Sequence, residues 1–196
     1  MSDQSLPVGR VLHSSTASFT IGTKTLAAEV PRFGGFVKAC VSEACDVIGL
    51  IYDVVLEDDL FARQLIGAEV GAEYIADQRR NRQMPIEVSV LVVGHADNGR
   101  LYQYLPPQPP ITLDEIMTCN DNEIIRFTSD FTFFRTVLDA RDARPDELLA
   151  AALRGAAVAR GPQQGRDFLV RAGRELSRLL AFDAVRLEGL LRRIKP

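Results

Sequence analysis

The sequence predicts an α+β fold, in which a small antiparallel β-barrel with a helical insertion is followed by a C-terminal helical hairpin or small bundle. Two observations indicate this fold class. Short segments rich in valine, isoleucine and phenylalanine recur over residues 1–128 and are separated by turn signals. From residue 129 onward, leucine and alanine recur at spacings of three and four residues, which is typical of amphipathic helices. We therefore expect a β domain over residues 1–128 and an α-helical region over residues 129–196.

Six segments in the first part of the chain have the composition of strands. In the best defined one, alternate residues from Ile86 to Val92 form one apolar face, while Leu91 and Val93 make its far end apolar on both faces. The six segments cover residues 9–15, 17–21, 34–41, 47–55, 85–95 and 101–104.

The connections between these segments differ in kind. Asn98-Gly99 is a favoured pair where the backbone needs a positive φ, so it predicts a tight hairpin turn before residues 101–104. Residues 56–84 lose the strand pattern and are expected to form a helical or irregular insertion. This insertion interrupts an otherwise continuous barrel.

A proline-rich stretch follows the sixth segment. The prolines at positions 106, 107, 109 and 110 cannot donate ladder hydrogen bonds, so we expect the sheet edge to end at Leu105 and a stiff strap to follow. The alternative is a ligand for an SH3-like groove, because Pro106 and Pro109 form one P-x-x-P match. Thr112 and Glu115 resemble a capping box and predict a helix over residues 113–119. Residues 122–127 are then expected to form the strand that closes the barrel.

The last third of the chain has the pattern of packed helices. Pro145 is suited to a first helical turn, and the glycines at 161 and 165 predict a break between two helices. Beyond the break, Leu169, Ala172, Leu176 and Leu179 form an apolar stripe, and arginines occupy the other faces. This pattern predicts the C-terminal hairpin or small bundle.

Charge and composition limit the class of protein. The 196 residues carry a net charge of −3, with no apolar run of membrane-spanning length and no secretory signal at the N-terminus, so we expect a cytoplasmic protein that does not bind membranes. Residues 1–128 hold 17 acidic and 10 basic side chains, whereas residues 129–196 hold 9 and 13. The two parts could attract each other or bind different partners. Three cysteines without an export signal are expected to be reduced thiols.

The order of these motifs resembles a known domain. The opening Gly9-Arg10-Val11, the segment FGGFVKA, the strand IGLIYDV and the proline-bearing exit are similar to the HAS-barrel, over roughly residues 8–127. This small barrel precedes the ATPase core of HerA-type DNA translocases, and a related barrel begins the catalytic subunits of rotary ATP synthases. The resemblance implies a barrel used for assembly and for docking on partners.

The chain departs from that family where the ATPase core would begin. A phosphate-binding loop needs the pattern G-x-x-x-x-G-K-[ST], and no such pattern occurs in the sequence. Residues 21–25, IGTKT, are the nearest match and lack the Gly-Lys pair. A helical region takes the place of the ATPase core, so the resemblance implies no ATPase activity and we expect no enzyme.

Several clusters of side chains are candidates for binding. Arg79, Arg80 and Arg82 could grip a phosphate or a partner's carboxylates, although a solvated helix end explains them as well. Tyr102 and Tyr104 alternate on one expected strand and could stack on bases. The acidic residues could hold Mg²⁺ or simply start a helix; they are Asp53, Glu57, Asp58 and Asp59.

Soft metal ligands are few in the sequence, and their spacing fits no common zinc motif, so we expect no metal or other cofactor. These residues are Cys40, Cys45, Cys119, His13 and His95.

The sequence leaves three hypotheses about function. The first is a non-enzymatic interaction module that docks on a partner such as a HerA-like ATPase or associates with itself. The second is a nucleic-acid-binding barrel that uses the arginines, the tyrosines and the basic C-terminal region. The third is a metal-dependent hydrolase built on the acidic residues.

Overall fold

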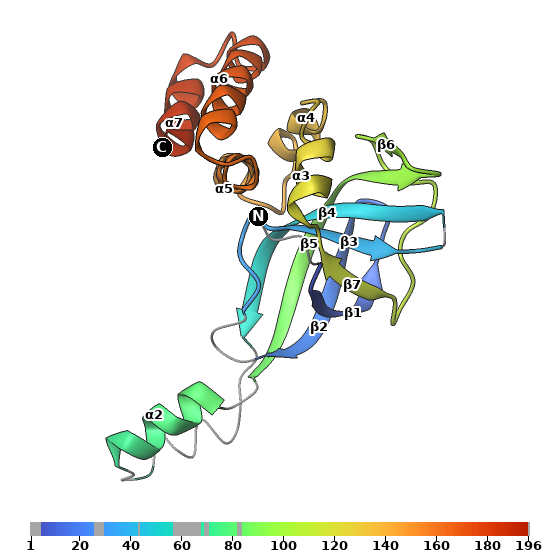
Figure 1. Ribbon diagram of the computed structural model, residues 1–196, viewed down its shortest axis with the longest axis vertical. Helices are drawn as coiled ribbons and strands as arrows, with labels where there is room; N and C mark the ends of the chain where they lie inside the picture. Colours follow the sequence, from blue (N-terminus) through green and yellow to red (C-terminus); the bar gives the residue numbers. More distant parts are fainter. Residues whose placement is uncertain are drawn as a thin grey trace.

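The chain folds into an antiparallel β-barrel with a layer of helices on one side (Figure 1). The computed structural model describes residues 5–25, 30–42, 44–56, 68, 71–81 and 84–195. In this part of the chain, seven strands form one sheet in the order β2-β1-β7-β3-β4-β5-β6, and β2 also pairs with β5. Six strands therefore close the barrel, and β6 extends beyond it. The strands are β1 (Pro7–Ser14), β2 (Ser18–Thr25), β3 (Phe36–Cys40), β4 (Cys45–Leu56), β5 (Met84–Asp97), β6 (Arg100–Tyr102) and β7 (Glu115–Thr118).

The predicted α+β class with a small antiparallel barrel is confirmed, and each of the six expected strand segments corresponds to one of β1 to β6. The hairpin turn between β5 and β6 is confirmed as well. Asn98 and Gly99 have φ values of 48° and 76°, which is the backbone conformation that this pair was expected to supply. Within the insertion, α2 (Ala72–Asn81) is helical and lies apart from the other helices (Figure 1).

The two elements that follow the proline stretch are the reverse of those predicted. Glu115–Thr118 forms strand β7, which pairs with both β1 and β3 and closes the barrel. Residues 121–127 form helix α3 (Asp121–Phe127), not a strand. The capping box is made by Asn120 and Glu123: the Asn120 side chain accepts from the Glu123 amide, and the Glu123 carboxylate accepts from the Asn120 amide. This box starts the helix eight residues later than the expected one.

The sheet edge also ends earlier than predicted, at Tyr102 instead of Leu105. The side chain of Gln103 explains the difference. Its amide nitrogen donates to the Phe127 carbonyl at 2.6 Å, and its oxygen accepts from the Phe133 amide at 2.9 Å. These bonds draw the chain toward the helices before the prolines begin. The proline strap then crosses to β1, where the Ser14 hydroxyl donates to the Pro110 carbonyl.

The helical region consists of α3 and four further helices, which are α4 (Phe133–Leu138), α5 (Pro145–Ala159), α6 (Pro162–Leu179) and α7 (Ala184–Ile194). Its amphipathic pattern is confirmed, because Ala172 and Leu176 on α6 are buried. None of the helices in the described ranges is long and apolar enough to cross a membrane. The boundary predicted at residue 128 stays a prediction.

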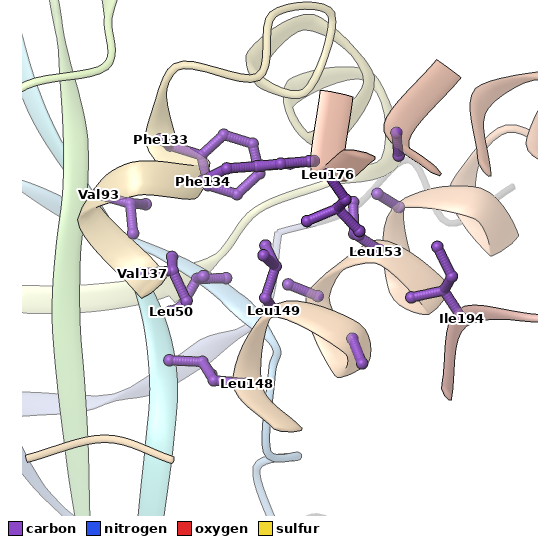
Figure 2. Packing of buried hydrophobic residues seen from close by; sticks show 14 of the residues in the cluster. Leu50, Val93, Phe133, Phe134, Val137, Leu148, Leu149, Leu153, Leu176 and Ile194 are labelled. Atoms are coloured by element: carbon purple, nitrogen blue, oxygen red, sulfur yellow. The ribbon is translucent and has the colours of Figure 1, made fainter. Parts of the chain in front are cut away.

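Two apolar cores lie on opposite faces of the β3-β4-β5 part of the barrel. Side chains such as Val92 fill the barrel interior. Leu50 of β4 and Val93 of β5 point outward from the barrel and pack against Val137 and Leu149 of the helices (Figure 2). The expectation that the end of β5 is apolar on both faces is therefore met by a barrel core on one side and by helices on the other. The helical region packs directly on the barrel.

Candidate functional site

The two tyrosines predicted to stack on bases lie together against His95 of β5. The ring centroid of His95 is 5.1 Å from that of Tyr102 and 5.2 Å from that of Tyr104. His95 is buried, and its Nδ1–H donates to the Tyr104 carbonyl at 3.2 Å. Tyr102 stacks on the imidazole and is thereby partly covered, whereas the side chain of Tyr104 is 60% exposed. Only Tyr104 of this pair therefore offers a largely open ring.

The structure does not bring the predicted arginines beside these tyrosines. Arg79 and Arg80 belong to α2, which lies at the opposite end of the molecule from β6 (Figure 1). Arg82 lies outside the described residues. The part of α2 that carries Arg79 and Arg80 therefore does not lie beside the aromatic pair.

Of the predicted acidic residues, the structure describes Asp53, whereas Glu57, Asp58 and Asp59 lie outside the described residues. Asp53 is on β4 and borders a polar pocket of about 500 Å³ that Arg144 and Glu147 also line. Its carboxylate accepts from the neighbouring Val54 amide at 3.0 Å. Over the described ranges, no three histidine, cysteine, aspartate or glutamate side chains are grouped closely enough to hold a metal ion.

A second cleft, of about 510 Å³, lies between the β3–β4 hairpin and α3. Lys38 on β3 forms an ion pair with Glu123 of the capping box inside this cleft. Burial acts to lower the pKa of Lys38, but the hydrogen bond to Glu123 and the nearby carboxylates leave it raised. Burial also raises the pKa of the Cys119 thiol, which therefore stays protonated and is a poor nucleophile. The sequence reasoning missed the ion pair between Lys38 and Glu123. The capping box at Asn120, which contains Glu123, was the signal that could have indicated it.

Arg160 is a half-buried cation at the end of α5. Its guanidinium donates to the Ile125 carbonyl at 3.0 Å and to the Thr128 hydroxyl at 2.7 Å, and it lies 4.0 Å from the centroid of the Phe168 ring. Burial, together with the charge of Arg171, lowers its pKa to about 10. These contacts tie the end of α3 to α5 and α6, which indicates a structural role for this cation.

Exposed aliphatic side chains gather where the proline strap meets β1. Leu12, Ile111 and Leu113, which we call the strap surface, are all exposed, and the two strap residues are 67% and 66% exposed. Main-chain hydrogen bonds hold the two segments side by side: the Leu113 amide donates to the Val11 carbonyl at 2.9 Å, and the Val11 amide donates to the Asp114 carbonyl at 3.0 Å. The strap therefore forms an ordered apolar surface on the barrel wall.

The turn that carries this surface is fixed in an unusual conformation. Leu113 has a φ of 76°, in the left-handed region that glycine adopts most easily. The Asp114 carboxylate accepts from the Ile111 amide at 2.7 Å, and Arg10 donates to the Leu113 carbonyl at 2.9 Å.

Searches with protein-family models and against curated proteins find no match to this chain.

Proposed function

We propose that this chain is a non-enzymatic interaction module whose barrel docks on a protein partner, and that this partner is a HerA-like ATPase. The observation that carries the proposal is the strap surface. A leucine at a turn position with positive φ costs conformational energy that glycine would avoid. Leu113 buries little of its side chain in return, since two thirds of it is exposed. A partner that covers Leu113 would offset this conformational cost by burying the leucine side chain.

The apolar character of the strap surface favours a protein over a nucleic acid. Burial of Leu12, Ile111 and Leu113 would contribute about 1–2 kcal/mol for each side chain. The turn is already held by Arg10 and Asp114, so little conformational entropy is lost when a partner binds. Nucleic acids, in contrast, are bound mainly through phosphate contacts with basic side chains.

The resemblance of residues 8–127 to the HAS-barrel indicates the class of partner. In HerA-type translocases the barrel belongs to the same chain as the ATPase, whereas this sequence has no phosphate-binding loop. A barrel that is followed by helices in place of such a loop can dock on an ATPase supplied by another chain. The assignment of the partner rests on this likeness, and the location of the docking surface rests on the exposed side chains.

The test is a binding measurement with substitutions in the strap surface. The tagged chain is expected to co-purify with a HerA-like ATPase from the cells that produce both. In titration calorimetry with the purified ATPase, Leu113→Asp and Ile111→Asp should each weaken binding at least about tenfold, because a carboxylate replaces an apolar contact.

Val170→Asp provides the matched control, because Val170 is 51% exposed on α6 and lies outside the strap surface. This variant should bind the ATPase as wild type does. The proposal is wrong if the purified wild-type chain does not bind the ATPase, or if Leu113→Asp and Ile111→Asp bind it with unchanged affinity.

A further inference from the structure

A fully exposed phenylalanine lies at the turn between α6 and α7. Phe182 is completely accessible to solvent, and Val185, three residues later, is 85% exposed. The turn is nevertheless well ordered, because the Asp183 carboxylate caps α7 by accepting from the Arg186 amide at 3.0 Å. The Arg186 side chain in turn bonds to Asp146 of α5 at 2.8 Å. Phe182 and Val185, which we call the knob, are therefore presented on a rigid support.

An apolar groove lies at the other end of α7. It has a volume of about 570 Å³ and is bordered by Arg154 and Arg166. Its wall includes Val158, which is 81% exposed although it is apolar. The close approach of α5 and α6 that shapes the groove needs a glycine at 165, where a Cβ atom would lie 2.3 Å from the Ala157 carbonyl oxygen. The remaining apolar side chains of the groove are those of Ala157, Pro162, Leu169 and Ile194.

The knob and the groove match in size, polarity and charge. A volume of about 570 Å³ lies within the range of pockets that bury a small molecule, so the groove can take an aromatic ring and an aliphatic side chain. Asp183, which follows Phe182 in the chain and caps α7, adds a negative charge next to the knob, and the groove carries the positive Arg154 and Arg166 at its rim. A second copy of this chain thus supplies an apolar insert with the complementary charge.

The positions of the two features allow them to pair reciprocally. The knob lies at the start of α7, and Ile194 of the groove lies in its last turn, so the 11-residue helix separates them by about 16 Å. Two antiparallel α7 helices would place each knob at the groove of the other copy. A two-fold arrangement of this kind closes on itself.

We propose that two copies of this chain associate through their helical regions, with the Phe182 knob of each copy inserted in the apolar groove of the other. The proposal does not rest on the docking function of the barrel. The two surfaces lie in different regions, the strap surface on the barrel wall and the knob and groove on the helices.

The oligomeric state tests the proposal. Analytical ultracentrifugation of the wild-type chain over a concentration series should show a monomer–dimer equilibrium. Phe182→Asp and Val158→Asp should each raise the dissociation constant at least about tenfold, since one removes both knobs and the other alters both grooves. Each variant keeps the feature that the other lacks. A mixture of the two should therefore form more dimer than either variant alone, through the one intact knob–groove pair.

Leu113→Asp separates this proposal from the docking function, because it should leave the dimer unchanged while it weakens ATPase binding. Far-UV circular dichroism should show that Phe182→Asp folds as wild type does, since its side chain contacts solvent. The proposal is overturned if the wild-type chain is a monomer at every concentration, if Phe182→Asp forms dimers as strongly as wild type, or if the mixture gains no dimer.

Discussion

At the scale of single residues, Leu113 combines backbone strain with exposure of an apolar side chain. Its φ of 76° costs a leucine or an alanine about 1–2 kcal/mol relative to glycine. Glycine keeps only part of this advantage, because it has more conformational freedom in the unfolded chain and folding removes that freedom. We therefore expect Leu113→Gly to be more stable than Leu113→Ala by about 0.5–1 kcal/mol in urea denaturation. Both variants lack the leucine side chain and differ mainly in strain.

Val170 gives the matched comparison for this pair of substitutions. It is also exposed, but it lies within α6, where glycine is the poorer residue. Val170→Gly should therefore be less stable than Val170→Ala by about 1 kcal/mol. If Leu113→Gly is also less stable than Leu113→Ala, the strain assigned to this turn is wrong.

Local sequence signals predicted some of these residue conformations and missed others. Asn98-Gly99 was predictable because the two residues that need a positive φ are the types that adopt it easily. Leu113 carries no such signal. Gln103 was also unpredictable, since its hydrogen bonds reach the Phe127 carbonyl and the Phe133 amide, 24 and 30 residues away along the chain.

At the scale of elements, the segment from 112 to 127 shows why a local pattern is not sufficient. From the sequence we predicted a capping box at Thr112 and did not consider one at Asn120. The structure has the box at Asn120, because residues 115–118 are needed to bridge β1 and β3 in the barrel. Strand pairing between distant segments thus overrides the helix signal, and periodicity alone could not reveal it.

Asp130 shows how a single carboxylate stabilises the start of an element. It accepts from the Thr132 amide at 2.7 Å and from the Thr132 hydroxyl at 2.6 Å, directly before α4, and these bonds lower its pKa. Because the folded-state pKa is the lower one, the stabilisation is present above the unfolded-state pKa and is lost as the pH falls through the folded-state value. Asp130→Ala should therefore lower the free energy of unfolding by about 0.5–1 kcal/mol at neutral pH.

This difference between wild type and Asp130→Ala should shrink when urea denaturation is repeated at about pH 3, below the ordinary pKa of an aspartate carboxyl. Asp130→Asn is the matched control, because the amide oxygen still accepts hydrogen bonds but does not titrate. The difference between Asp130→Asn and Asp130→Ala should stay constant over the same pH range. If wild type is more stable than Asp130→Ala by the same free energy of unfolding at both pH values, the role assigned to the Asp130 carboxylate is wrong.

At the scale of the whole molecule, the outer face of the barrel and the helices share one of the two apolar cores. The sequence predicted strands β1 to β6, the amphipathic helices and the two apolar faces of β5, because these depend on periodicity. It did not predict which barrel face the helices cover, since Leu50 and Val93 meet Val137 and Leu149 only in the folded chain (Figure 2). The strap surface and the knob were missed for a related reason, because exposure of an apolar residue depends on the packing around it.

The shared core predicts that the two regions unfold together. All four tyrosines precede residue 105 and the chain has no tryptophan, so intrinsic fluorescence reports on the first part of the chain. Circular dichroism at 222 nm reports mainly on α5, α6 and α7. In Leu149→Ala, a cavity in the core should lower the stability by about 2–5 kcal/mol and shift both transitions to the same lower denaturant concentration. Val170→Ala, at an exposed position, should leave both in place. Separate midpoints in Leu149→Ala would mean that barrel and helices are independent units.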